Sequence, residues 1–127
     1  MQNGFSETAF IGAYANAFEA RDASRVADFY HMPCLSVRAD GSVHTFSYGV
    51  DIESFFAKVL DAYAQEGMAK FAFANVECDA MGNAAVCLVC SWSTRRSDDS
   101  VIREWRQSYI FQRIASDWKI IASVFHL

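Results

Sequence analysis

Three stretches in the first half of the chain space their apolar residues as helices do. Ser6 can cap the first helix, and four apolar residues then share one face at 3.6-residue spacing: Phe10, Ile11, Tyr14 and Phe18. Asp22 can cap a short second helix, which we expect Pro33 to end because the residue before a proline avoids helical geometry. Its inner side would carry Val26, Phe29 and Tyr30.

A third helix is expected over about 50–66, followed by Gly67 as a C-terminal cap residue. Its apolar stripe comprises Ile52, Phe55, Phe56, Val59, Leu60 and Tyr63. Between the second and third helices, Asp40-Gly41 divides two short runs and predicts a β-hairpin over 34–46.

After Gly67 the apolar residues alternate, as they do in strands. We expect strands near 69–79, 84–96, 101–113 and 117–126, joined by short turns and therefore antiparallel. Helices followed by a run of strands predict an α+β fold, and the length suits one domain over 1–127.

Several of these strands are apolar on both faces. Val86 and Leu88 alternate with Cys87 and Val89, and the last strand shows the same pattern. Because the helices can cover only one face, we expect a second copy of the chain to cover the other and form a homodimer.

The stretch 101–113, VIREWRQSYIFQR, mixes aromatic, cationic and amide side chains on both faces. Two explanations remain open. One is a curved sheet whose inner face lines a cavity at one end and meets helices further along, while its outer face meets a partner and water. The other is an edge strand with solvated ends.

Composition narrows the classes of protein. Of the residues, 53% are apolar and 15% aromatic, which is enough for a core and for the walls of a ligand cavity. The formal charge of −4 argues against a general nucleic-acid binder. No apolar run reaches the roughly 18 residues of a membrane span, and the first residues do not resemble a signal peptide, so we expect a cytoplasmic protein without a membrane partner.

The cysteines and histidines do not predict a metal site or another cofactor. Cys87 and Cys90 have C-x-x-C spacing, but residues three apart on a strand point to opposite faces. We therefore expect reduced, structural thiols at Cys34, Cys78, Cys87 and Cys90. The three histidines are scattered, without the spacing of metal ligands.

The order of elements resembles the nuclear transport factor 2-like superfamily and, within it, the SnoaL-like group. The resemblance covers essentially the whole chain and is carried by FIGAYANAFEARDASRVADFYHMP, GVDIESFFAKVLDAYAQEG and YIFQRIASDWKIIASVFH. It implies a cone-shaped α+β barrel: a curved, mainly antiparallel sheet wrapped around three N-terminal helices. It also implies a cavity at the open end and dimerisation through the convex face.

Enzymes of the superfamily use general acid–base chemistry on small apolar substrates. Tyr14 is placed like the oxyanion-stabilising tyrosine of ketosteroid isomerase, although it also lies on the apolar stripe and suits a core position. The matching position of the isomerase base falls near Val37 or Arg38, where this chain has no carboxylate. Asp40 is explained by its turn. The sequence therefore departs from the isomerase pattern.

Without a well-placed carboxylate base, proton transfer would fall to His126 or His31. The candidate catalytic residues are His126, Tyr14 and His31, and the candidate ligand-binding residues are Tyr30, Arg38, Trp92, Trp105 and Tyr109. Each has a structural alternative. His126 suits a hydrogen-bonded core position, His31 a helix C-terminus, Arg38 a surface ion pair, and the aromatic residues the core.

Two functions remain open. The first is binding of a small apolar or aromatic ligand, with lyase, isomerase or cyclase chemistry undetermined. The second is a non-catalytic homodimeric module whose cavity is filled by its own side chains.

Overall fold

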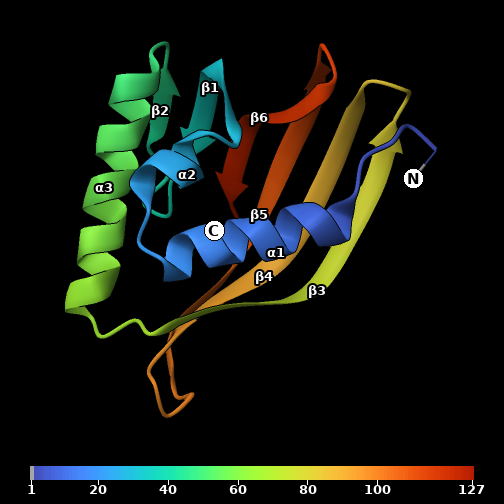
Figure 1. Ribbon diagram of the computed structural model, residues 1–127. Helices are drawn as coiled ribbons and strands as arrows, with labels where there is room; N and C mark the ends of the chain where they lie inside the picture. Colours follow the sequence, from blue (N-terminus) through green and yellow to red (C-terminus); the bar gives the residue numbers. More distant parts are fainter. Residues whose placement is uncertain (1) are drawn as a thin grey trace.

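Six strands form one curved sheet, and three helices pack on its inner side (Figure 1). The computed structural model describes residues 2–127. The helices are α1 (Glu7–Glu19), α2 (Ala23–Ala27) and α3 (Gly49–Gln65). The strands are β1 (Tyr30–Val37), β2 (Val43–Phe46), β3 (Lys70–Met81), β4 (Ala85–Arg95), β5 (Val101–Ile114) and β6 (Asp117–Phe125).

The strand order in the sheet is β2-β1-β6-β5-β4-β3. All neighbours are antiparallel except β1 and β6, which run parallel. The expected α+β fold with a mainly antiparallel sheet is thereby confirmed. Because β5 lies between β4 and β6, it is not an edge strand, and this explanation for its mixed faces is wrong.

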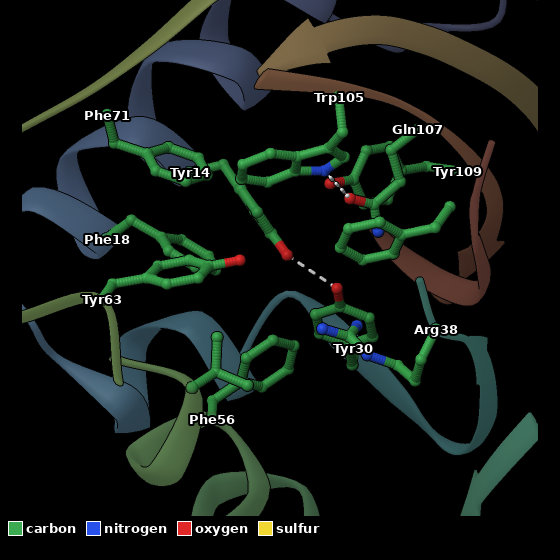
Figure 2. Close-up of a pocket in the computed structure, with 12 residues that line it drawn as sticks. Tyr14, Phe18, Tyr30, Arg38, Phe56, Tyr63, Phe71, Trp105, Gln107 and Tyr109 are labelled. Atoms are coloured by element: carbon green, nitrogen blue, oxygen red, sulfur yellow. Dashed lines mark hydrogen bonds between the residues drawn. The ribbon is translucent and has the colours of Figure 1, made fainter. Parts of the chain in front are cut away.

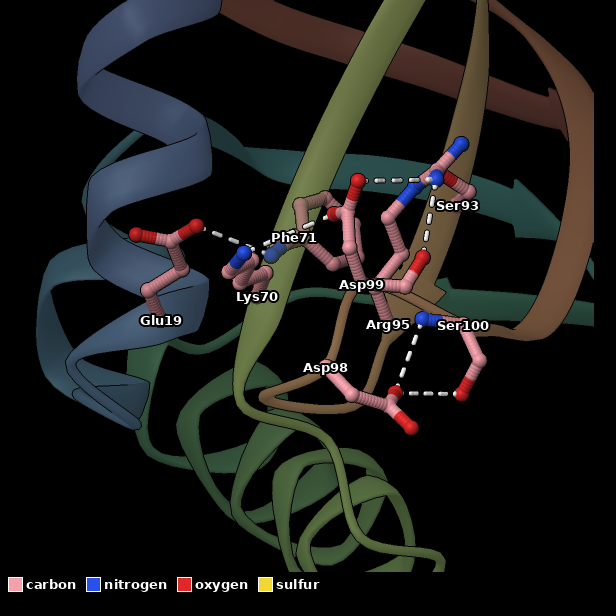
Figure 3. A network of polar contacts seen from close by, with 8 residues as sticks. All are labelled: Glu19, Lys70, Phe71, Ser93, Arg95, Asp98, Asp99 and Ser100. Atoms are coloured by element: carbon pink, nitrogen blue, oxygen red, sulfur yellow. Dashed lines mark hydrogen bonds and ion pairs between the residues drawn. The ribbon is translucent and has the colours of Figure 1, made fainter.

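Helix α1 crosses the inner face of the sheet and delivers its aromatic stripe to the core (Figure 1). Ser6 caps it as predicted, accepting a hydrogen bond from the Ala9 amide at 3.3 Å. At its other end, the Glu19 carboxylate accepts the Phe71 amide of β3 at 2.9 Å (Figure 3). Both ends of α1 are thus fixed by side-chain acceptors.

The turn between β4 and β5 is fastened to β3 by charges (Figure 3). Asp98 accepts the Ser100 amide at 3.0 Å, while the Asp99 carboxylate lies 3.5 Å from Lys70 Nζ and 3.7 Å from Arg95 Nη1. Lys70 and Asp99 are exposed and Arg95 is partly exposed, so the ion pairs add little stability.

The expected role of Pro33 is wrong. Asp22 does cap α2, but α2 ends at Ala27, and Tyr30 begins β1 by pairing with Ile120 of β6. Pro33 lies inside β1, where the β1–β6 register shifts between Tyr30 and Leu35. A proline, which has no amide hydrogen, fits a strand where regular pairing is interrupted.

Strand β6 contains a bulge that reverses its faces. Ile110 of β5 pairs with Ala122, whereas the adjacent Phe111 pairs with Ile120, so Ile121 is the extra residue. Before the bulge Ile120 is buried, and after it Ser123 and Phe125 are buried. One extra residue shifts the alternation by one position.

No helix within residues 2–127 is long and apolar enough to cross a membrane.

Candidate functional site

A small cavity lies between α1, α3 and the inner face of the sheet (Figure 2). Its volume is about 10 Å³, which is about the room of one water molecule. Its aromatic walls are Tyr14, Phe18, Tyr30, Phe56, Tyr63, Phe71, Trp105, Tyr109 and Phe125. Val59, Arg38 and Gln107 complete the lining. The resting cavity is thus almost filled by its own side chains.

Three buried tyrosines from different elements meet at this cavity. The hydroxyl oxygens of Tyr14 on α1 and Tyr30 on β1 lie 2.6 Å apart, and Trp92 Nε1 donates to the Tyr109 hydroxyl at 2.8 Å. The Tyr14 hydroxyl also interacts with that of Tyr109. Figure 2 shows the hydroxyls of Tyr14, Tyr30 and Tyr63 directed toward the same space.

Burial is the main cause of the raised pKa values of these phenols. It raises the pKa of Tyr30 to about 12 and holds the pKa values of Tyr14 and Tyr109 well above 10. The pKa of Tyr63 is also raised, mainly by burial. At neutral pH these groups are therefore hydrogen-bond donors rather than bases.

Beside Tyr30, the surroundings of the cavity are polar (Figure 2). Ser36 of β1 and Ser123 of β6 are buried with their hydroxyl oxygens 3.0 Å apart, and Arg38 Nη1 donates to Ser36 Oγ at 3.1 Å. The Arg38 guanidinium lies over the rings of Phe55 and Phe125, at 4.9 and 4.6 Å from their centroids. Arg38 is the one charged residue that lines the cavity in the described part of the chain.

An open groove of about 330 Å³ adjoins the cavity and shares Tyr63, Trp105 and Phe125 with it. The rings of Trp105 and Phe125 are stacked, with centroids 5.5 Å apart and planes at 13°. This pair therefore lies between the groove and the cavity and is the natural position for an entrance.

The structure brings five of the predicted site residues together at this cavity: Tyr14, Tyr30, Arg38, Trp105 and Tyr109. Trp92 lies fully buried beside them and contacts the site through the Tyr109 hydroxyl, without lining the cavity. The roles of these residues in binding or catalysis stay predictions.

The two candidate histidines lie outside the cavity. Regular alternation along β6 predicts that His126 shares a face with Ile120, but the bulge at Ile121 turns it to the other side of the strand, where Nε2 lies 2.7 Å from Ser108 Oγ. It borders the outer groove and is exposed. His31 lies in β1 rather than at a helix end, with Nδ1 3.1 Å from the Pro33 carbonyl oxygen. Neither position places an imidazole against a molecule in the cavity.

Sequence reasoning missed several residues of the site. Ser36 and Ser123 had a weak signal as small polar residues in apolar strands, and Gln107 lies between Trp105 and Tyr109 on the same face of β5. Gln107 Oε1 accepts the Trp105 Nε1 hydrogen at 2.9 Å. Phe125 became a wall residue only through the bulge.

The lining contains no carboxylate and no histidine among residues 2–127. The same part of the chain holds no group of three or more His, Cys, Asp or Glu side chains that could bind a metal ion. The site can therefore donate hydrogen bonds to an oxygen and enclose an apolar body, but its lining supplies no ordinary base.

A curved sheet that closes over helices around an internal cavity defines the NTF2-like class of α+β proteins. The family model described as NTF2-like protein (DUF6841) matches residues 6–127, so the chain belongs to this family. The expected superfamily is confirmed, while the narrower SnoaL-like group stays a prediction. Comparison with curated proteins finds no match.

Solved structures show the same fold. Aln2 from a Streptomyces species superimposes with a TM-score of 0.77 at 13% identity, over 94% of this chain and 86% of that one. An NTF2-like protein with a cystatin-like fold from Novosphingobium aromaticivorans gives 0.76 at 13% identity, over 94% and 77%. A putative aromatic ring hydroxylase from the same organism gives 0.69 at 15% identity, over 94% and 85%. At these identities the likeness concerns the fold alone.

Proposed function

We propose that the protein binds a small, largely apolar molecule in the cavity between α1, α3 and the sheet. The observation that carries this proposal is the convergence of three buried tyrosine hydroxyls on a space whose other walls are mostly aromatic rings. Apolar walls with a few placed polar groups are typical of ligand sites. A flat ligand suits them, and the neighbour named as a putative aromatic ring hydroxylase is compatible with such a ligand.

Any catalysis would be of the oxyanion-stabilising kind, as in a lyase, isomerase or cyclase reaction. The protonated hydroxyls of Tyr14, Tyr30 and Tyr109 can donate hydrogen bonds to an oxygen on which charge develops. Such reactions also remove a proton from the substrate. Because the lining lacks a base, another part of the substrate, a water molecule or a group that enters with the ligand would have to accept this proton.

A thermal-shift screen of flat aromatic and alicyclic molecules tests this function. We expect ligands that raise the melting temperature of the wild-type protein and bind less tightly to Tyr30→Phe, which removes one cavity hydroxyl. Tyr48→Phe is the matched control, because Tyr48 is 69% exposed and lies outside the cavity. Ligands that bind both variants like the wild type would place binding elsewhere and contradict the proposal.

One observation favours the second candidate, a non-catalytic module with a self-filled cavity. The cavity holds only about 10 Å³, and within residues 2–127 every buried side-chain nitrogen and oxygen has a hydrogen-bond partner. Under this alternative, no molecule of the screen would bind, and enlarging the cavity with Phe56→Ala would lower stability without creating affinity.

We also propose a homodimer through the outer face of the sheet. Two rows of paired residues run across that face. One comprises Val43, Val37, Val124, Ser108 and Val89 and ends at Glu77; the other comprises Leu35, Ala122, Ile110 and Cys87 and ends at Thr45 and Asp79. The helices pack on the inner face, so these mostly apolar rows are not covered by the chain itself. A cytoplasmic location is part of the proposal and is supported by four free cysteines.

A further inference from the structure

The polar surroundings of the cavity beside Tyr30 contain a cation without an acidic partner. Two arginines on β5 have carboxylate partners: Arg103 Nε donates to Glu66 at 2.7 Å and Arg106 Nη2 to Glu77 at 2.8 Å. A third, Arg113, is exposed outside the cavity and donates to the Asn3 carbonyl oxygen at 3.3 Å. Arg38 has no carboxylate within 4.0 Å in the described part of the chain. Although the protein has a net charge of −4, the guanidinium of Arg38 at the cavity wall is not neutralised by a carboxylate of the described chain and can bind an anion.

The surroundings of Arg38 leave its donors free. The central carbon of the guanidinium lies over the rings of Phe55 and Phe125, and these rings accept no ordinary hydrogen bond from its N–H groups. One of these donors is used by Ser36 Oγ. A guanidinium whose position is limited by two neighbouring rings can use its remaining N–H groups to bind a pair of anionic oxygens.

The hydroxyl groups beside Arg38 also have a surplus proton. The chain of hydroxyls runs through Tyr109, Tyr14, Tyr30, Ser123 and Ser36. Its two end contacts come from Trp92 Nε1 and Arg38 Nη1, which can only donate.

Five hydroxyls carry five protons but have at most four contacts with one another, so at least one O–H must donate outside the chain. Within residues 2–127 the structure gives that proton no protein acceptor. The side-chain carbonyl oxygen of the lining, Gln107 Oε1, already accepts from Trp105. The hydroxyl chain therefore has more donors than acceptors, and the oxygen of a water molecule or of a ligand can accept the remaining proton.

We propose that the ligand is a small monocarboxylic acid with a flat apolar body, bound with its carboxylate at Arg38 and the adjacent hydroxyls. This inference rests on the proposed function and names the class of molecule for the same cavity. The body of the ligand occupies the space between the tyrosines and the Trp105–Phe125 pair. Since the closed cavity has only about 10 Å³, that pair moves toward the outer groove of about 330 Å³ when the ligand enters.

Isothermal titration with matched probes tests the proposal. Benzoate, cinnamate and 2-naphthoate are compared with their primary amides, which have the same shape without the charge. We expect the acids to bind at least ten-fold more tightly than the amides, and Arg38→Gln to remove at least ten-fold of the affinity for the acids. Arg38→Lys keeps the charge and should retain part of it.

The control variant is Arg113→Gln, because Arg113 lies over the Trp118 ring at 5.8 Å and does not line the cavity. It should leave acid binding unchanged. Each variant is first compared with the wild type by its melting temperature, so that a loss of fold is recognised, and Arg38→Lys decides the outcome if Arg38→Gln is unfolded.

The outcomes are distinct. Amides that bind as tightly as the acids, with no effect of the Arg38 substitutions, overturn the carboxylate assignment and leave cavity binding intact. Failure of both series to bind overturns the proposed function itself.

Discussion

The hydroxyl group of Tyr109 is the acceptor for a buried tryptophan and therefore contributes to the stability of the core. The side chain of Tyr109 is 1% exposed, and its oxygen accepts the indole hydrogen of Trp92, which is 0% exposed. The indole nitrogen of Trp92 has no other hydrogen-bond partner among residues 2–127. Removing that acceptor would leave a buried donor without a partner.

We expect Tyr109→Phe to lower the free energy of unfolding by about 1–3 kcal/mol, the usual cost of an unsatisfied buried donor. Urea denaturation followed by tryptophan fluorescence measures this. Tyr48→Phe, at an exposed position, should change the free energy of unfolding by less than about 0.5 kcal/mol. Equal effects of the two substitutions would show that the hydrogen bond is unimportant.

The pH dependence of stability follows from the buried phenols and thiols. Burial raises the pKa of Cys90 from 9.0 to about 12 and that of Tyr30 from 10.0 to about 12. As the pH rises past 9, the unfolded chain loses these protons while the native chain retains them, so unfolding becomes more favourable.

Stability should therefore be complete below about pH 9 and fall continuously toward pH 12. The urea midpoint measured at pH 7.5 and at pH 10.5 should decrease at the higher value. The Cys90→Ala variant should lose less stability over this interval than the wild type. A midpoint that stays constant up to pH 10.5 would contradict the assigned burial of these groups.

Among the elements, α1 has the greatest influence on the site because it carries Tyr14 and Phe18 to the cavity. Its first turn is capped by the Ser6 hydroxyl. We expect Ser6→Ala to lower the free energy of unfolding by about 1 kcal/mol, because the Ala9 amide loses its acceptor, and Ser6→Asp to keep most of the stability. Urea denaturation of both variants measures the difference, and an unchanged Ser6→Ala variant would show that the cap contributes nothing.

Most elements could be predicted from the sequence because their signals are local. Ser6 and Asp22 cap helices, Asp40-Gly41 forms a turn, and the four last strands have nearly the expected bounds. The bulge in β6 could not be predicted, since Ile121 and its neighbours are apolar and suit either face. This one residue explains why Phe125 lines the cavity and His126 does not. Pro33 was misplaced because pairing of β1 with β6 determined the conformation there.

The cavity was predictable as a cluster of aromatic residues but not as a volume. Tyr14, Tyr30, Trp105 and Tyr109 are brought together as expected. Whether such rings enclose an empty volume or fill it depends on how the side chains pack against one another. The pattern of apolar and polar residues along the chain does not determine this packing.

For the whole molecule, the uncovered outer face of the sheet makes a prediction about assembly. Val124 lies at the middle of one apolar row, between Val37 and Ser108. Sedimentation at micromolar concentration should give about 28 kDa, twice the mass of the 14.2 kDa chain, as for a face-to-face dimer. A monomer at high concentration would contradict it.

Val124→Glu should shift the sedimenting mass to that of the monomer, because a charge would be buried in the interface. Val50→Glu is the control, since Val50 is 69% exposed at the start of α3. Dissociation by both substitutions would mean that the outer face is not the interface.

The stacked Trp105–Phe125 pair has a consequence for the speed of binding. If the pair has to separate before a molecule can enter, association cannot be faster than that separation, and the observed binding rate should level off as the ligand concentration rises. Stopped-flow tryptophan fluorescence with 2-naphthoate would measure this limit. Phe125→Ala removes one ring of the pair and should restore a rate that increases linearly with concentration, whereas a linear dependence in the wild type would show that the entrance is already open.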